Sequence, residues 1–199
     1  MTAGRPIASL RGFARRACGV LAPRANRGIA AVEFALYSVV FLPLLAGTTD
    51  VGMLIYTHFQ LDAAVAAGAQ YAVVNAANVN SSSGASLATS IATLVANTQG
   101  SGRANSTVVV NNGPSAAVTS GSASSSGTAS SADSYYCPSG TPGSWTWGSA
   151  VAAGASCTGG STAGKFVTVV ASRTYSSIFP GISIVHSGPI SQSVIVQVQ

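Results

Sequence analysis

The chain has 199 residues and a formal net charge of +5, which leaves room for one ordinary domain plus an anchor and at first suggests a basic protein. Six of its nine positive side chains, however, are arginines that precede Ile29. If the chain were cut after Gly28, the remainder would carry three positive and four negative side chains, a sum of −1. This argues against a nucleic-acid-binding protein, because no basic surface for phosphates would remain.

The first segment, residues 1–28, is basic and contains no acidic side chain. It differs from a standard secretory signal, because its arginines continue to Arg27 and the apolar run comes after them. A mitochondrial transit peptide has a similar composition, but here a membrane anchor follows instead of a soluble enzyme. Positive residues that flank an apolar segment hold that side in the cytoplasm. We therefore expect residues 1–28 to be a cytoplasmic basic leader.

An apolar run after the leader predicts one transmembrane helix. Residues 34–49 carry no charge, and the 21 residues from 29 to 49 are close to the ~20 that cross a bilayer. Because apolar side chains resume after Asp50, we place the membrane part at about residues 29–56. A buried core helix of a soluble protein is the less favoured alternative, since arginines flank the run. Pro43 removes one backbone hydrogen bond and predicts a kink.

Helix-forming residues continue beyond the membrane part and predict one long helix over residues 29–78. The stretch from residue 63 to 72 is rich in alanine, which would let neighbouring helices approach closely. The same alanines could instead pack under the C-terminal part of the molecule. The sequence leaves both roles open.

Glu33 is an acid near the start of the apolar run. A comparable acid in the middle of a membrane helix costs roughly 2.5 to 3.5 kcal/mol on insertion scales, so it usually marks a function or a partner. The alternative is that Glu33 lies near the cytoplasmic interface and stays hydrated.

The segment around Glu33 resembles the processing site of type IV prepilins, with Gly28 before Ile29, Glu33 as the fifth residue after the cut, and Phe34 next. Over about residues 27–75 the chain is similar to TadE-like proteins, which are minor pilins or pseudopilins of the tight-adherence (Flp) pilus system. The residues that carry this likeness are Ala30-Ala31-Val32-Glu33-Phe34-Ala35-Leu36, Pro43, Asp50, Gly52 and the run Ala66-Ala67-Gly68-Ala69-Gln70-Tyr71-Ala72. The family often has arginine where Gln70 stands, which leaves any role of that position open.

The resemblance implies a mechanism. A prepilin peptidase would cut after Gly28, where the missing side chain allows close approach of the protease. Glu33 could then compensate the new amino group on Ile29 of a neighbouring subunit. The implied partners are this peptidase, other pilins, the Tad assembly machinery and the inner membrane. The protein would span that membrane once, with its leader in the cytoplasm and its head in the periplasm, and whether it enters the surface pilus or stays as an assembly factor is left open.

Residues 79–199 predict an extracytoplasmic α+β head. A linker at 80–86 precedes a short helix with apolar residues at 87, 91, 94 and 95, and strands are expected at 107–110, 166–171, 182–185 and 194–198. Residues 111–114 should form a turn, while Gly181 and Gly188-Pro189 should be breaks. Residues 115–134 are so rich in Ser, Gly, Ala and Thr that they predict a flexible surface loop. The predicted fold class is α+β and pilin-like: a long N-terminal transmembrane helix that continues as a periplasmic rod, packed against a small antiparallel sheet of three or four strands.

Two cysteines remain once Cys18 is removed with the leader. In an oxidising compartment Cys137 and Cys157 should form a disulfide, worth roughly 3 kcal/mol for a loop of this length. A metal site is not expected, because two cysteines without a nearby histidine cannot complete a tetrahedral site. The loop between them and its approach carry aromatic residues that could form either a contact surface or a plug for the small core: Tyr135, Tyr136, Trp145 and Trp147.

We expect no enzyme, and therefore no catalytic residue and no cofactor. We expect the two histidines, His58 and His186, to be ordinary polar surface groups. The three aspartates are scattered along the chain. No nucleophile elbow, glycine-rich phosphate loop or spaced pair of carboxylates is present. A different alternative is an unprocessed, single-pass, membrane-anchored extracytoplasmic binding protein, which would not be cut at Gly28 and would not need Glu33.

Overall fold

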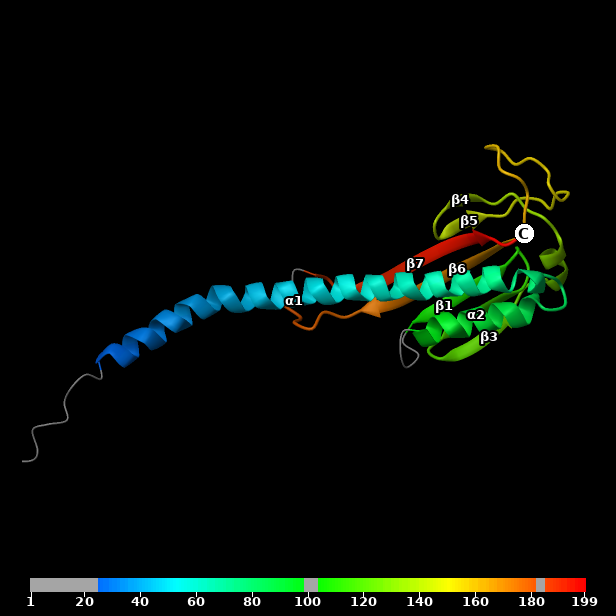
Figure 1. Ribbon diagram of the computed structural model, residues 1–199. Coiled ribbons are helices and arrows are strands. Elements are labelled where there is room, and N and C mark those ends of the chain that lie inside the picture. Colours follow the sequence, from blue (N-terminus) through cyan, green and yellow to red (C-terminus); the bar gives the residue numbers. More distant parts are fainter. Residues whose placement is uncertain (1–24, 99–103, 182–184) are drawn as a thin grey trace, which may run out of the picture. The chain divides into compact units, whose positions relative to one another are not determined.

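The computed structural model describes residues 25–98, 104–181 and 185–199. The predicted leader, apart from its last residues, lies outside this part of the chain, as do residues 182–184 of one predicted strand. The residue contacts divide the chain into two units, Met1–Leu45 and Ala46–Gln199. The helices and strands are shown in Figure 1: α1 (Ala25–Val74), η1 (Ala76–Asn78), α2 (Gly84–Thr98), β1 (Asn105–Val110), β2 (Ser115–Thr119), β3 (Ser122–Ser126), η2 (Ala129–Asp133), β4 (Ser139–Thr141), β5 (Ser144–Thr146), β6 (Phe166–Tyr175) and β7 (Gly188–Gln197).

In the first unit, helix α1 is apolar and exposed around almost its whole circumference. Large apolar side chains such as Phe34, Val39 and Leu42 are each more than half exposed. By its length and composition this helix could cross a membrane. Pro43 lies inside the helix, and the kink predicted there stays a prediction.

In the second unit, helix α1 buries one face in the core of the head. Most of the buried positions are separated by three, four or seven residues, which places them along one side of the helix; these are Ala46, Asp50, Thr57, Leu61, Ala64, Gly68 and Ala72. The compact unit that contains the head therefore begins at Ala46 of helix α1, while the domain boundary placed between residues 78 and 79 stays a prediction. Of the alanines between residues 63 and 72, Ala64 and Ala72 pack in the molecule's own core, whereas Ala63 and Ala66 are exposed.

Helix α2 and one five-stranded antiparallel sheet complete the head. The strand order is β3-β2-β1-β6-β7, with β1 and β6 in register at Val108 and Val169. The α+β fold with a small antiparallel sheet is thereby confirmed, with one strand more than the upper expected number. Helix α2 begins at Gly84, before the predicted end of the linker at residue 86. The side-chain oxygen of Asn80 accepts hydrogen bonds from the amides of Ser82 and Ser83, and this turn leads the chain into the helix.

The segment predicted as a flexible loop over residues 115–134 is ordered and forms β2, β3 and η2. Alternate residues of β2, Ala116 and Val118, are buried in the core, while every residue of β3 is exposed. Strand β3 is therefore held by its backbone pairing to β2. Composition concealed these strands, because a two-stranded serine-rich ribbon needs few apolar side chains when only one of its strands faces the core.

Strand β7 also differs from the expectation. It runs from Gly188 and includes Pro189, so Gly188-Pro189 opens a strand instead of breaking one. Proline is tolerated here because β7 is an edge strand and the proline is its second residue. Of the strand predicted at 182–185, only Val185 is described, and it lies outside the strands.

Gly68 is a position where helix α1 closely approaches α2 and the sheet. A Cβ at this position would lie 2.7 Å from Val95 of α2 and 3.2 Å from Val169 of β6. The sequence indicated only that Gly68 is a poor helix former. In the structure its missing side chain allows α1 to pack against α2 and β6.

We expect Gly68→Ala to lower the free energy of unfolding by about 1 to 2 kcal/mol, because overpacking a core outweighs the gain of about 1 kcal/mol in helix propensity. Gly52→Ala is the matched control on the same helix, since a Cβ there would meet no atom within 4 Å. Thermal unfolding of the two variants in detergent, followed by circular dichroism, measures the difference. Equal stability of the two variants would contradict this packing.

Candidate functional site

The predicted processing site lies on the exposed N-terminal part of helix α1. Gly28 has no atom within 4 Å of the position a Cβ would take, and Ile29 is 66% exposed. Glu33 follows Ile29 by four residues on the same helix, which corresponds to about 6 Å along its axis, and it is exposed. The three residues are therefore together on one accessible helical segment.

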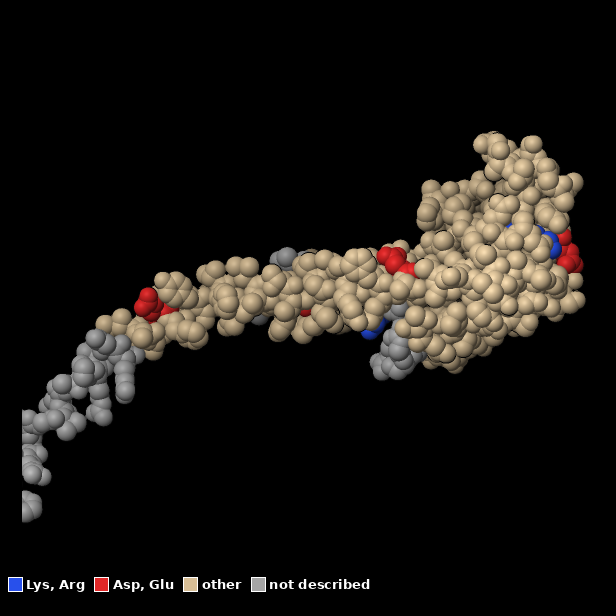
Figure 2. All heavy atoms as spheres, in the orientation of Figure 1, with Lys and Arg blue, Asp and Glu red and all other residues tan. Residues whose placement is uncertain are grey.

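The helix surface that follows Glu33 is apolar on all sides. Exposed apolar side chains between residues 34 and 45 include Phe34, Tyr37, Val40, Phe41 and Leu44. On the face seen in Figure 2 this part of α1 is almost wholly uncharged. Such a surface can be covered by lipid or by apolar helices of other subunits.

Asp50 is the next acid on helix α1 and is completely buried. Its Oδ2 accepts a hydrogen bond of 2.6 Å from the Ser177 hydroxyl, and its Oδ1 accepts one of 2.9 Å from the backbone amide of Ile178. The Tyr175 hydroxyl donates to the backbone carbonyl of Asp50 at 2.9 Å. Asp50 thus fastens the chain that follows strand β6 to helix α1.

The environment of Tyr175 follows from this contact. Burial raises the pKa of its hydroxyl, and the negative charge of Asp50 raises it further. The neutral phenol is therefore favoured in the folded protein.

His58 lies about two helical turns beyond Asp50 on α1. Its Nδ1 atom is 3.3 Å from Nε2 of Gln192 on β7, so His58 is a partly buried packing residue between helix and sheet.

Another acid, Asp133 at the end of η2, links this element to the chain that precedes α2. Its Oδ1 accepts a hydrogen bond of 2.9 Å from the Ser81 amide. Nearby, the ammonium group of Lys165 is buried, donates to the carbonyl of Val79 at 2.9 Å, and lies 5.7 Å from the centre of the Tyr135 ring. Hydrogen bonds from the side chain and backbone of Ser81, helped by the charge of Lys165, hold the pKa of Asp133 below its ordinary value of 3.8.

This contact predicts a pH dependence on the acid side. Because the folded-state pKa is lowered, the contribution of Asp133 to stability is present above the ordinary value of 3.8 and is lost as the pH falls through the folded value. Ser81→Ala removes the largest cause of the lowered pKa, so its stability should approach that of the wild type as the pH falls through this window. Ser82→Ala, a change at the exposed neighbour, is the control. Thermal unfolding in detergent from neutral pH downwards tests this, and a pH-independent effect of Ser81→Ala would contradict it.

The predicted disulfide joins Cys137 to Cys157, with their Cα atoms 5.6 Å apart. The aromatic residues of this region contact other groups of the head. The ring of Tyr136 is buried and stands edge-on to Trp147, with 6.0 Å between centroids, and Trp145 is half-buried. These contacts favour a packing role for the aromatic residues over a purely exposed contact surface.

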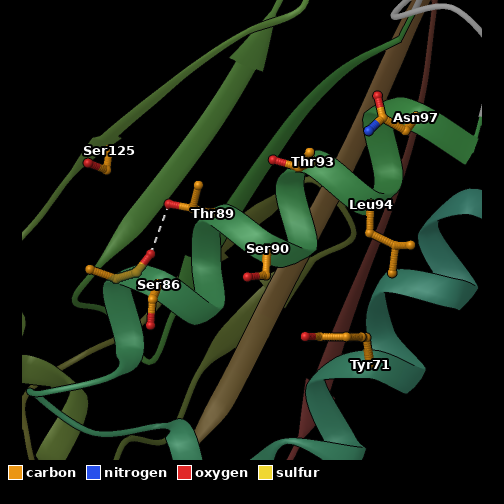
Figure 3. A pocket seen from close by; sticks show the side chains of 9 residues that line it. Tyr71, Ser86, Thr89, Ser90, Thr93, Leu94, Asn97 and Ser125 are labelled. Atoms are coloured by element: carbon orange, nitrogen blue, oxygen red, sulfur yellow. Dashed lines mark hydrogen bonds between the residues drawn. The ribbon is translucent and has the colours of Figure 1, made fainter.

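An open groove between helices α1 and α2 was not predicted from the sequence. Figure 3 shows Tyr71 of α1 and Leu94 of α2 at one end, with hydroxyl groups of α2 along it. The Thr89 hydroxyl donates to the carbonyl of Ala85 at 3.0 Å. Apart from Tyr71, Leu94 and Ala85, the groove is lined by small polar residues that carry no charge: Ser86, Thr89, Ser90, Thr93, Asn97 and Ser125.

Within residues 25–98, 104–181 and 185–199, the histidines, cysteines and acids form no group of three that could hold a metal ion. The sequence-predicted residues Gly28, Ile29 and Glu33 lie together, whereas Cys137 and Cys157 lie in the other unit. Sequence reasoning missed the partners of Asp50. The available signal was that Asp50 interrupts an apolar sequence, which continues on both sides of it. Such an acid is expected to have hydrogen-bond donors, but the sequence does not show which residues supply them.

Residues 28–70 match the model of the TadE-like protein family, and the resemblance stated from the sequence is confirmed over this segment. The matched residues contain the Gly28-Ile29 junction, Glu33, Asp50 and Gly68. No curated protein and no solved structure matches the chain.

Proposed function

We propose that this chain is a minor pilin or pseudopilin of the tight-adherence pilus, processed by a prepilin peptidase after Gly28. The family match supports an association with this pilus in general. The observation that carries the finer proposal is that Gly28, Ile29 and Glu33 lie on one exposed helical segment at the start of an apolar surface, within the matched residues.

In this proposal the apolar part of α1 is a single membrane anchor, with the leader in the cytoplasm and the head outside the inner membrane. Removal of the leader creates a positive amino group on Ile29. In an assembly of helices, Glu33 of an adjacent subunit pairs with this amine, so that neither charge is desolvated alone. The exposed apolar side chains between residues 34 and 45 then provide the helix contacts. The role is structural and not enzymatic.

Processing is tested by coexpressing the chain with a prepilin peptidase and measuring its intact mass in membranes. We expect wild-type protein to lose residues 1–28 and Gly28→Leu to keep them, because a leucine side chain blocks close approach of the protease to the bond. Gly19→Leu, within the leader, is the control and should be cut like the wild type. Equal processing of Gly28→Leu and Gly19→Leu would contradict a cut after Gly28. An uncut wild-type chain would instead favour the membrane-anchored binding protein.

A further inference from the structure

The segment that follows strand β6, residues 176–181, presents an apolar tip to solvent. Ile178 is 52% exposed and the adjacent Phe179 is 41% exposed. No charged residue occurs in this segment. A contiguous exposed apolar surface can mark a contact with a protein or a membrane.

This apolar tip is fixed to helix α1 by Asp50. Both oxygens of the Asp50 carboxylate accept hydrogen bonds from the segment, one from Ser177 and one from Ile178. The Ser187 hydroxyl, at the far end of the connection to β7, lies 3.0 Å from the amide of Ser177 and accepts its hydrogen bond. The position of Ile178 along α1 is therefore set by Asp50.

Asp50 lies near the outer end of the predicted membrane part of α1, about residues 29–56. The 21 residues from 29 to 49 are about the length that crosses a bilayer. Beyond Asp50 the exposed side of α1 still carries Met53, Ile55, Tyr56 and Phe59. Tyrosine among apolar residues is typical of the interface between hydrocarbon and water.

We propose that Ile178 and Phe179 insert into the outer leaflet of the membrane that α1 spans, so that the head rests on the bilayer through residues 176–181. The proposal rests on the membrane anchor of the proposed function. We take lipid as the occupant of this surface because the tip carries no charge and is hydrogen-bonded to Asp50, which directly follows the uncharged stretch of α1 over residues 34–49. The carboxylate can lie at this depth because its oxygens are already hydrogen-bonded by Ser177 and Ile178.

The test uses spin labels on the full chain in nanodiscs that hold a single copy, so that lipid is the only apolar partner present. Phe179→Cys reports on the tip, Val40→Cys on the anchor, and Val151→Cys, exposed in the disulfide region, on a position remote in sequence from both. All three carry Cys18→Ser, and the disulfide keeps Cys137 and Cys157 from reacting. Accessibility to molecular oxygen is compared with accessibility to a water-soluble nickel complex.

We expect the ratio of oxygen accessibility to nickel-complex accessibility to be similar for Phe179→Cys and Val40→Cys. In both variants this ratio should be several-fold higher than in Val151→Cys. Adding Asp50→Ala to Phe179→Cys should shift the label towards water, because the segment loses both hydrogen bonds. If Phe179→Cys resembles Val151→Cys while Val40→Cys is in lipid, the insertion is overturned and the anchor stands. If Val40→Cys is itself exposed to water, the anchor of the proposed function fails.

Discussion

Asn111→Ala should lower the free energy of unfolding by about 3 kcal/mol, a large stability effect for a single polar side chain. Asn111 is completely buried in the turn between β1 and β2. Its amide nitrogen donates to the carbonyls of Ala132 at 3.1 Å and Ser134 at 2.6 Å, and its side-chain oxygen accepts from the Phe166 amide at 3.2 Å. Alanine would leave these buried groups unsatisfied, at about 1 kcal/mol or more each.

The neighbouring residue provides a matched control for Asn111. Asn112 has the same left-handed backbone, with φ of 55° against 50° for Asn111, but its side chain is exposed. Asn112→Ala should therefore cost only about 1 kcal/mol, from the left-handed conformation alone. In a thermal scan in detergent, a loss of about 3 kcal/mol corresponds to a decrease of about 6 to 12 °C in Tm. Equal Tm values for the two variants would contradict the role of the Asn111 side chain.

Glu33→Gln should abolish recovery of the chain in sheared surface fibres while leaving cleavage after Gly28 intact. Glutamine keeps the shape of the side chain and removes its charge, so the Ile29 amine of the neighbouring subunit would be desolvated without a partner. Breaking such a pair costs several kcal/mol, enough to reduce incorporation at least tenfold. The measurement is immunoblotting of fibre and membrane fractions, with intact mass to confirm processing.

The control for Glu33→Gln is Asp62→Asn, which removes an exposed acid from the same helix within the other unit. It should enter fibres like the wild type. Glu33→Asp keeps the charge on a shorter side chain and should recover part of the incorporation. Normal fibre incorporation of Glu33→Gln would show that no charge pair at this position is needed.

The sequence was sufficient for the parts of the fold that have strong apolar patterns. The continuation of helix α1 beyond the apolar run and the location of β6 followed from residue type, because helix formers continue without proline and valines cluster at the strand. The packing of helix α1 on the head was not accessible, since an alanine-rich helix that packs on its own domain has the same composition as one that packs on a neighbour. Only the contacts of Gly68 and Asp50 show which role the structure uses.

The serine-rich strands were missed for a different reason. Strand β3 contributes no buried side chain, so its existence depends on backbone pairing with β2, which leaves no apolar pattern in the sequence. The candidate site was partly predictable: Gly28, Ile29 and Glu33 are adjacent in sequence and share one helix. The donors to Asp50 come from residues 177 and 178, more than a hundred positions later, and no local pattern links them.

The identity of the first residue of the mature chain tests the central claim most directly. Intact mass and N-terminal sequencing of protein recovered from native membranes would establish it in one sample. The proposed function predicts a chain that begins at Ile29. A chain that begins at Met1 or Thr2 would contradict processing after Gly28 and leave no Ile29 amine for Glu33 to pair with.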